Sequence, residues 1–102
     1  MISALDHLII AVRNLDEAES NYKKIFGTNP VWRGNHKALG TANSIFNFNN
    51  TYLELLAENG DGLGADLIKQ ILEEKGEGLF GMVLGTDDIN MTSKNLKELG
   101  YL

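Results

Sequence analysis

Two residues of the chain, His7 and Glu54, have side chains that commonly bind metal ions, and both fall in predicted strands. His7 lies within residues 5–12, which are rich in β-branched and apolar residues and are predicted to form a strand. Side chains alternate along a strand, so His7 shares a face with Ile9. The neighbouring row of Leu8 and Ile10 is more apolar and should meet the helices, which turns His7 towards the opposite face of the sheet.

Glu54 is expected on that same face because of a predicted hairpin. Residues 43–48 and 51–56 are predicted strands around Asn49-Asn50, and asparagine tolerates the positive φ of a two-residue turn. This turn places Ile45 opposite Glu54 on a mixed, partly polar face. The other face of the hairpin is apolar and carries Phe46, Phe48, Leu53 and Leu55.

A histidine and a glutamate on one face of a curved sheet form a partial site for Zn, Ni, Co, Mn or Fe(II). The alternative is that His7 hydrogen-bonds within the sheet and Glu54 is solvated. His36, in a predicted loop at 35–41, is a candidate ligand-binding or acid/base group near neutral pH, or an exposed loop histidine. The candidate ligand-binding residues are Asn43, Asn47, Tyr52 and Trp32, of which the asparagines are alternatively an ordinary polar strand face and Trp32 a core residue.

The elements that position these residues are predicted from caps, glycines and apolar spacing. A helix is expected after Asn14, with Glu17 completing its capping box and Gly27 ending it. A short strand at 31–33 precedes the loop and hairpin. The later elements are a loop at 59–64, a helix closed by Gly76, a strand at 79–84, and a third helix capped by Asp87 or Asp88 that ends at Gly100.

The composition is that of one folded domain, with 102 residues of which 43% are hydrophobic and 23% charged. The absence of cysteine excludes disulfides, Fe–S clusters and thiol catalysis. The net charge of −5 argues against nucleic acid or an anionic membrane as the main partner. We expect neither a membrane span nor a signal peptide, and therefore a cytoplasmic protein.

A weak internal repeat relates residues 8–27 to residues 82–100, each with a strand, a cap, a helix and a glycine in that order. The repeat aligns Leu8 with Met82 and His7 with Gly81. The second copy ends after its helix, so the strands that follow the first helix have no counterpart.

Three segments together carry a resemblance to a known superfamily. They are Ala4-Leu5-Asp6-His7-Leu8-Ile9-Ile10-Ala11-Val12, Leu15-Asp16-Glu17-Ala18 and Thr51-Tyr52-Leu53-Glu54-Leu55-Leu56. This order resembles the glyoxalase/bleomycin-resistance/extradiol-dioxygenase superfamily, also called vicinal oxygen chelate proteins. The stretch from His36 to Gly40-Thr41-Ala42-Asn43 is similar to its glyoxalase-like subgroup. The resemblance covers residues 4–58, with a fainter echo at 79–100.

The resemblance implies an α+β fold, with a curved mixed sheet and helices on one face. It implies a single glyoxalase-like domain over residues 1–102, with a first βαβββ module at 1–58 and a helix plus an incomplete second module at 59–102. It further implies that His7 and Glu54 are metal ligands. The implied activity is that of a metal-dependent lyase, similar to lactoylglutathione lyase, or an isomerase or dioxygenase for a small oxygenated substrate. Glu54 and His36 are then the candidate catalytic residues.

The chain departs from the superfamily pattern at Gly81, which occupies the second module's first ligand position and cannot coordinate a metal. One chain therefore supplies at most two protein ligands. Three alternatives follow. A second chain in a homodimer completes the site, or the chain is part of a longer protein, or no metal binds and the concave face of the sheet holds an organic ligand. The alternative functions are accordingly a non-catalytic small-molecule-binding protein of the bleomycin-resistance type and a subunit whose role is assembly.

Overall fold

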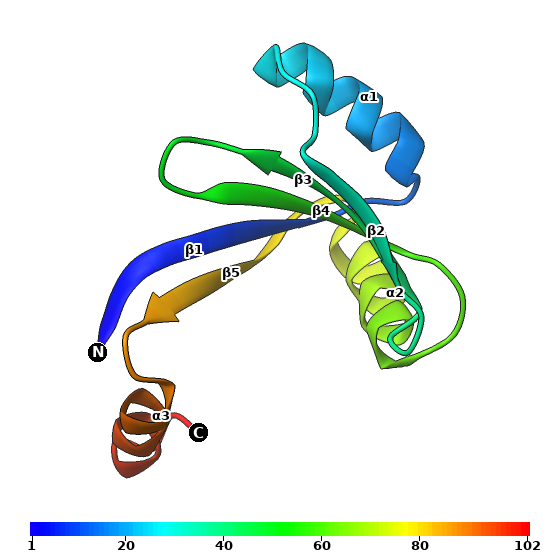
Figure 1. Cartoon of the computed structure of the whole chain (residues 1–102). Coiled ribbons are helices and arrows are strands. Elements are labelled where there is room, and N and C mark those ends of the chain that lie inside the picture. Colours follow the sequence, from blue (N-terminus) through cyan, green and yellow to red (C-terminus); the bar gives the residue numbers. More distant parts are fainter.

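The computed structural model describes residues 1–102 as a five-stranded mixed sheet with three helices, the α+β fold expected from the sequence (Figure 1). The strand order is β2-β3-β4-β1-β5, in which β1 runs parallel to β4 and the other neighbours are antiparallel. The elements are β1 (Ile2–Ala11), α1 (Leu15–Phe26), β2 (Trp32–His36), β3 (Thr41–Asn47), β4 (Tyr52–Glu58), α2 (Leu63–Lys75), β5 (Gly78–Thr86) and α3 (Ile89–Glu98).

Helix α1 begins and ends where its caps predict. The Asn14 side chain accepts a hydrogen bond of 2.9 Å from the Glu17 amide, and Gly27 closes the helix in the left-handed conformation with φ of 69°. Leu15 and Ala18 are buried against one face of the sheet, which we call the α1 face.

The predicted hairpin register is confirmed, because Ile45 lies opposite Glu54 and Phe46 opposite Leu53. Phe46 is fully buried on the α1 face. The predicted turn conformation is wrong, however, since no residue other than glycine has a positive φ. The hairpin closes through a 2.9 Å hydrogen bond from the Phe48 amide to the Thr51 carbonyl instead.

Strand β2 is longer than the predicted segment at 31–33. Its ladder with β3 runs from the Trp32–Ile45 pair to the His36–Thr41 pair, so part of the predicted loop at 35–41 is strand. The turn between the strands is short because Gly40 adopts φ of 70° there.

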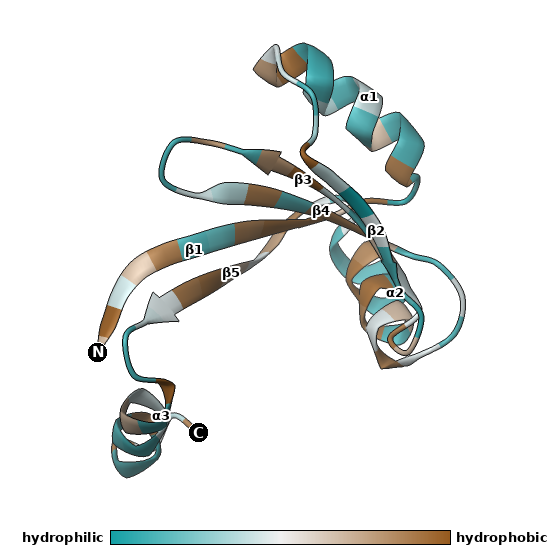
Figure 2. Cartoon of the chain, in the orientation of Figure 1, coloured by the Kyte–Doolittle hydropathy of each residue, from teal (hydrophilic) through white to brown (hydrophobic).

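The expectation that the helices lie on one face of the sheet is wrong. Figure 1 shows α1 and α2 on opposite sides of the sheet. Ile68 and Leu72 of α2 pack with Ala11 and Leu56 on what we call the α2 face. The reason is that β4 carries apolar residues on both faces near its carboxyl end, and Figure 2 shows a similar continuous apolar stretch along the second half of β1. Each apolar face needs a helix to cover it.

Helix α3 lies at the far end of β5, near the amino terminus of the chain (Figure 1). Of the two predicted caps, Asp88 is the one that caps this helix, because its side chain accepts a 2.9 Å hydrogen bond from the Met91 amide. Where β5 runs beside β1, His7 lies opposite Val83, Leu8 opposite Met82 and Ile9 opposite Gly81. No helix is both long and apolar enough to cross a membrane.

Candidate functional site

His7 and Glu54 lie close together on the α2 face of the sheet. His7 Nε2 is 3.3 Å from Glu54 Oε1, and the two side chains are 11% and 13% exposed. The contact is diagonal, because the parallel register of β1 and β4 pairs His7 with Tyr52 and Ile9 with Glu54. Strand alternation thus brings together two residues that are 47 positions apart in the sequence.

The imidazole of His7 is held from two sides. His7 Nδ1 is 2.8 Å from Asp6 Oδ2, and the Tyr52 ring stacks on the imidazole with 4.3 Å between centroids and 12° between planes. A carboxylate at Nδ1 orients the ring and leaves Nε2 directed towards Glu54. The hydrogen bond with His7 lowers the pKa of Asp6. Burial raises the pKa of Tyr52, and the charges of Asp6 and Glu54 add to this rise.

Glu54 also accepts a hydrogen bond of 2.8 Å at Oε2 from Asn43 Nδ2. Asn43 is 4% exposed, and its carboxamide oxygen is buried without any hydrogen-bond partner. Only the amide nitrogen can donate to a carboxylate, so the bond to Glu54 fixes the orientation of the carboxamide. The oxygen is therefore a buried acceptor, beside Glu54, that lacks a donor.

Asp6 was not among the residues singled out from the sequence. Neighbouring residues in a regular strand point to opposite faces, which separates Asp6 from His7. The ladder between β1 and β5 shifts register between Leu5 and His7, and this irregularity allows the carboxylate of Asp6 to reach the imidazole. The only sequence signal for the contact is adjacency.

A cavity of about 460 Å³ adjoins Glu54 between the α2 face and helix α2; we call it the α2 cavity. It is lined by Ile9, His36, Leu39, Thr41, Glu54, Leu56, Leu63, Gly64, Leu67, Ile68 and Phe80. His36 thus shares one cavity with Glu54, as its candidate role requires. Its Nδ1 lies 3.2 Å from Thr41 Oγ1.

The other candidate ligand-binding residues lie further from His7 and Glu54. Asn47 is exposed and pairs with Tyr52 across the hairpin. Trp32 is 58% exposed on the edge strand β2, where Ile45 separates it from Glu54 along the same row. Trp32 is therefore not a core residue.

The two candidate ligands fit a single metal ion. Zinc lies about 2.0–2.2 Å from nitrogen and oxygen ligands, so two tetrahedral ligands are about 3.4 Å apart. The 3.3 Å between His7 Nε2 and Glu54 Oε1 agrees with this spacing. The structure contains no group of three histidine or acidic residues that could hold a metal, so His7 and Glu54 alone would be an incomplete ligand set.

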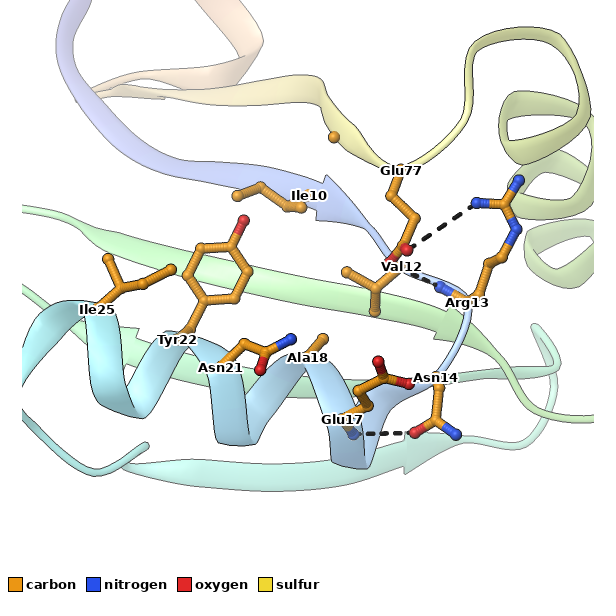
Figure 3. Close-up of a pocket in the computed structure, with 11 residues that line it drawn as sticks. Ile10, Val12, Arg13, Asn14, Glu17, Ala18, Asn21, Tyr22, Ile25 and Glu77 are labelled. Atoms are coloured by element: carbon orange, nitrogen blue, oxygen red, sulfur yellow. Dashed lines mark hydrogen bonds and ion pairs between the residues drawn. The ribbon is translucent and has the colours of Figure 1, made fainter.

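A second hollow, of about 410 Å³, lies along α1 on the other face of the sheet (Figure 3). Two of its charged residues are paired with each other, since the Arg13 backbone amide donates to Glu77 Oε2 over 3.3 Å and the Arg13 guanidinium lies 4.0 Å from Glu77 Oε1. The His7–Glu54 pair, with its unpartnered Asn43 oxygen, is the stronger candidate site.

The family model described as glyoxalase-like domain matches residues 5–102. No curated protein sequence matches the chain. Among solved structures, a Streptomyces coelicolor methylmalonyl-CoA epimerase variant in complex with 2-nitronate-propionyl-CoA has a TM-score of 0.83 and 21% identity, over 98% of this chain and 72% of that one. Methylmalonyl-CoA epimerase from Mycobacterium tuberculosis has a TM-score of 0.81 and 22% identity, over 97% and 65% of the two chains.

Proposed function

Because the chain belongs to the glyoxalase-like domain family, we propose that it is a metal-dependent isomerase or lyase with His7 and Glu54 as ligands of a divalent ion. The observation that carries this proposal is the 3.3 Å approach of His7 Nε2 to Glu54 Oε1 on one face of the sheet. Imidazole and carboxylate together suit Zn, Ni, Co, Mn or Fe(II). Structural similarity to methylmalonyl-CoA epimerases favours isomerisation over oxygenation.

A divalent ion at this site would act as a Lewis acid that polarises neighbouring oxygens of a small substrate. The neighbouring residues of the chain orient the two metal ligands. Asp6 and Tyr52 keep the His7 ring in place through the Nδ1 contact and the stacked ring. Asn43 holds Glu54 in place through Nδ2, and its buried oxygen would accept a hydrogen bond from a water enclosed beside the carboxylate. His36, which lines the same cavity as Glu54, is the candidate group for moving a substrate proton.

The ligand set needs further donors, because a catalytic zinc site usually has about three protein ligands. We propose that a second copy of the chain in a homodimer supplies them. Sedimentation of the metal-loaded protein tests this part, and a monomer at tens of micromolar would contradict it.

The proposal is tested by calorimetric titration of Zn, Ni, Co, Mn and Fe(II) into the wild type and into His7→Ala, Glu54→Gln and His36→Gln. We expect one equivalent of a divalent ion to bind the wild type and His36→Gln, and binding to be lost in the other two variants. Equal binding by all four proteins would refute the site.

Catalysis is then measured as exchange of a substrate proton with deuterium from the solvent, at the carbon next to the chelating oxygens. Exchange that His36→Gln slows, without loss of metal, is the result expected for an isomerase. Tight metal-dependent binding without exchange would instead indicate a small-molecule-binding protein.

A further inference from the structure

The α2 cavity has a polar end at Glu54 and a largely apolar body. Its walls come from several elements, with Ile9 and Phe80 on β1 and β5, Leu56 on β4, and Leu67 on α2. A volume of about 460 Å³ lies within the range of small-molecule sites, which run from about 300 to 1,000 Å³. The cavity can therefore hold a ligand that extends away from Glu54.

The outer wall is fixed by contacts between two backbones. The Ala65 amide donates to the Leu39 carbonyl over 2.9 Å, and the Asn59 amide donates to the Gly40 carbonyl over 2.7 Å. A Cβ added at Gly64 would lie 2.8 Å from the Leu39 carbonyl oxygen. Since only glycine permits this approach, the β2–β3 turn is held against the start of α2 and the wall is built before any ligand binds.

The charges around the cavity restrict what it binds. Its lining includes no lysine or arginine, and the titratable groups are Glu54 and His36. The body of the cavity therefore offers no side-chain cation to a charged group of the ligand. Leu63 and Leu67 are 82% and 51% exposed within this lining, so an apolar ligand would remove apolar surface from water.

We propose that the α2 cavity binds the aliphatic or aromatic arm of a substrate whose two neighbouring oxygens reach the His7–Glu54 site. The substrate class is then a small 2-oxo or 2-hydroxy carboxylic acid with an apolar side chain. The assignment of the oxygens rests on the proposed function, whereas the apolar arm rests on the cavity itself.

The test is a calorimetric binding series of pyruvate, 2-oxobutanoate, 2-oxohexanoate and 2-oxooctanoate, measured with Zn²⁺ and without it. Each methylene that enters the cavity is expected to lower the Kd by about fourfold. Leu67→Glu places a charge in the wall and should abolish this dependence on chain length. Ile25→Glu is the matched control, because Ile25 is a 69% exposed helix residue on the opposite face. Leu63→Glu, at a more exposed position, replaces Leu67→Glu if circular dichroism shows that the latter fails to fold.

The outcomes separate the two proposals. If the Kd values fall with chain length but are the same with and without Zn²⁺ and in His7→Ala, the apolar arm is supported and chelation of the substrate oxygens at the metal site is contradicted. Zn²⁺-dependent binding with the same Kd for all four acids supports the metal site and overturns the apolar arm. A chain-length dependence that Leu67→Glu and Leu63→Glu leave unchanged also overturns it, because the arm then binds elsewhere.

Discussion

The contact between Asn43 and Glu54 leads to a specific prediction for Asn43→Asp. In the wild type, Asn43 Nδ2 donates to Glu54 Oε2 over 2.8 Å, and Asn43 is only 4% exposed. The variant replaces the donor with a second acceptor at nearly the same position. Two carboxylates would then face each other in a site where water has little access.

The cost has two parts. Loss of a hydrogen bond to a charged group costs about 1.5–3 kcal/mol. Repulsion between unit charges about 3 Å apart adds up to about 5 kcal/mol at an effective dielectric constant of 20, before the side chains relax. We expect a net loss of about 3–5 kcal/mol in the free energy of unfolding at pH 7.5. This loss would lower the Tm by more than about 12 °C in a domain of this size.

Urea unfolding followed by circular dichroism measures this loss, with Asn47→Asp as the matched control. Asn47 lies on the same strand and the same face as Asn43 but is exposed, so its substitution should stay within about 0.5 kcal/mol. A divalent ion should restore more stability to Asn43→Asp than to Asn47→Asp, since the new carboxylate adds a ligand beside Glu54. Equal stability of the two variants without metal would refute the geometry assigned to Asn43.

Three further predictions concern the ring stacked on His7, the core and the cavity wall. The raised pKa of Tyr52 means that its contribution to stability is present below about pH 10 and is lost as pH rises through the folded-state pKa. Tyr52→Phe should therefore remove absorbance change from the high-pH end of an ultraviolet tyrosine titration, and an unchanged high-pH end would contradict this. Phe46→Ala should cost about 3–5 kcal/mol in urea unfolding because Phe46 is fully buried, and Phe48→Ala, at a 44% exposed position, should cost less. Gly64→Ala should lower the Tm although alanine favours helix by about 1 kcal/mol, because its Cβ meets the Leu39 carbonyl oxygen; a higher Tm would show that the wall is loose.

Strand periodicity accounts for the part of the site that the sequence predicts. Alternation places His7 and Glu54 on one face, and the hairpin register follows from the apolar pattern of Phe46, Leu53 and Leu55 even though the turn conformation differs. A shift of one residue would expose that apolar row, so the register is strongly specified.

The contacts that the sequence does not predict arise where that periodicity fails. Asp6 reaches His7 at a register shift in β1, which the alternation rule does not describe. Leu55 and Leu56 are adjacent apolar residues, so one face of β4 meets α1 and the other meets α2. The α2 cavity depends on the close approach of the Gly64 and Leu39 backbones. These residues belong to different elements and meet only in the folded chain, so no local sequence pattern predicts their contact.

Anomalous diffraction from crystals grown with one equivalent of Zn²⁺ or Co²⁺ would locate the metal ion and so decide whether His7 and Glu54 bind it. We expect a single anomalous peak within about 2.2 Å of both His7 Nε2 and a Glu54 carboxylate oxygen. A peak found only at other residues, with His7 and Glu54 still in contact with each other, would contradict it.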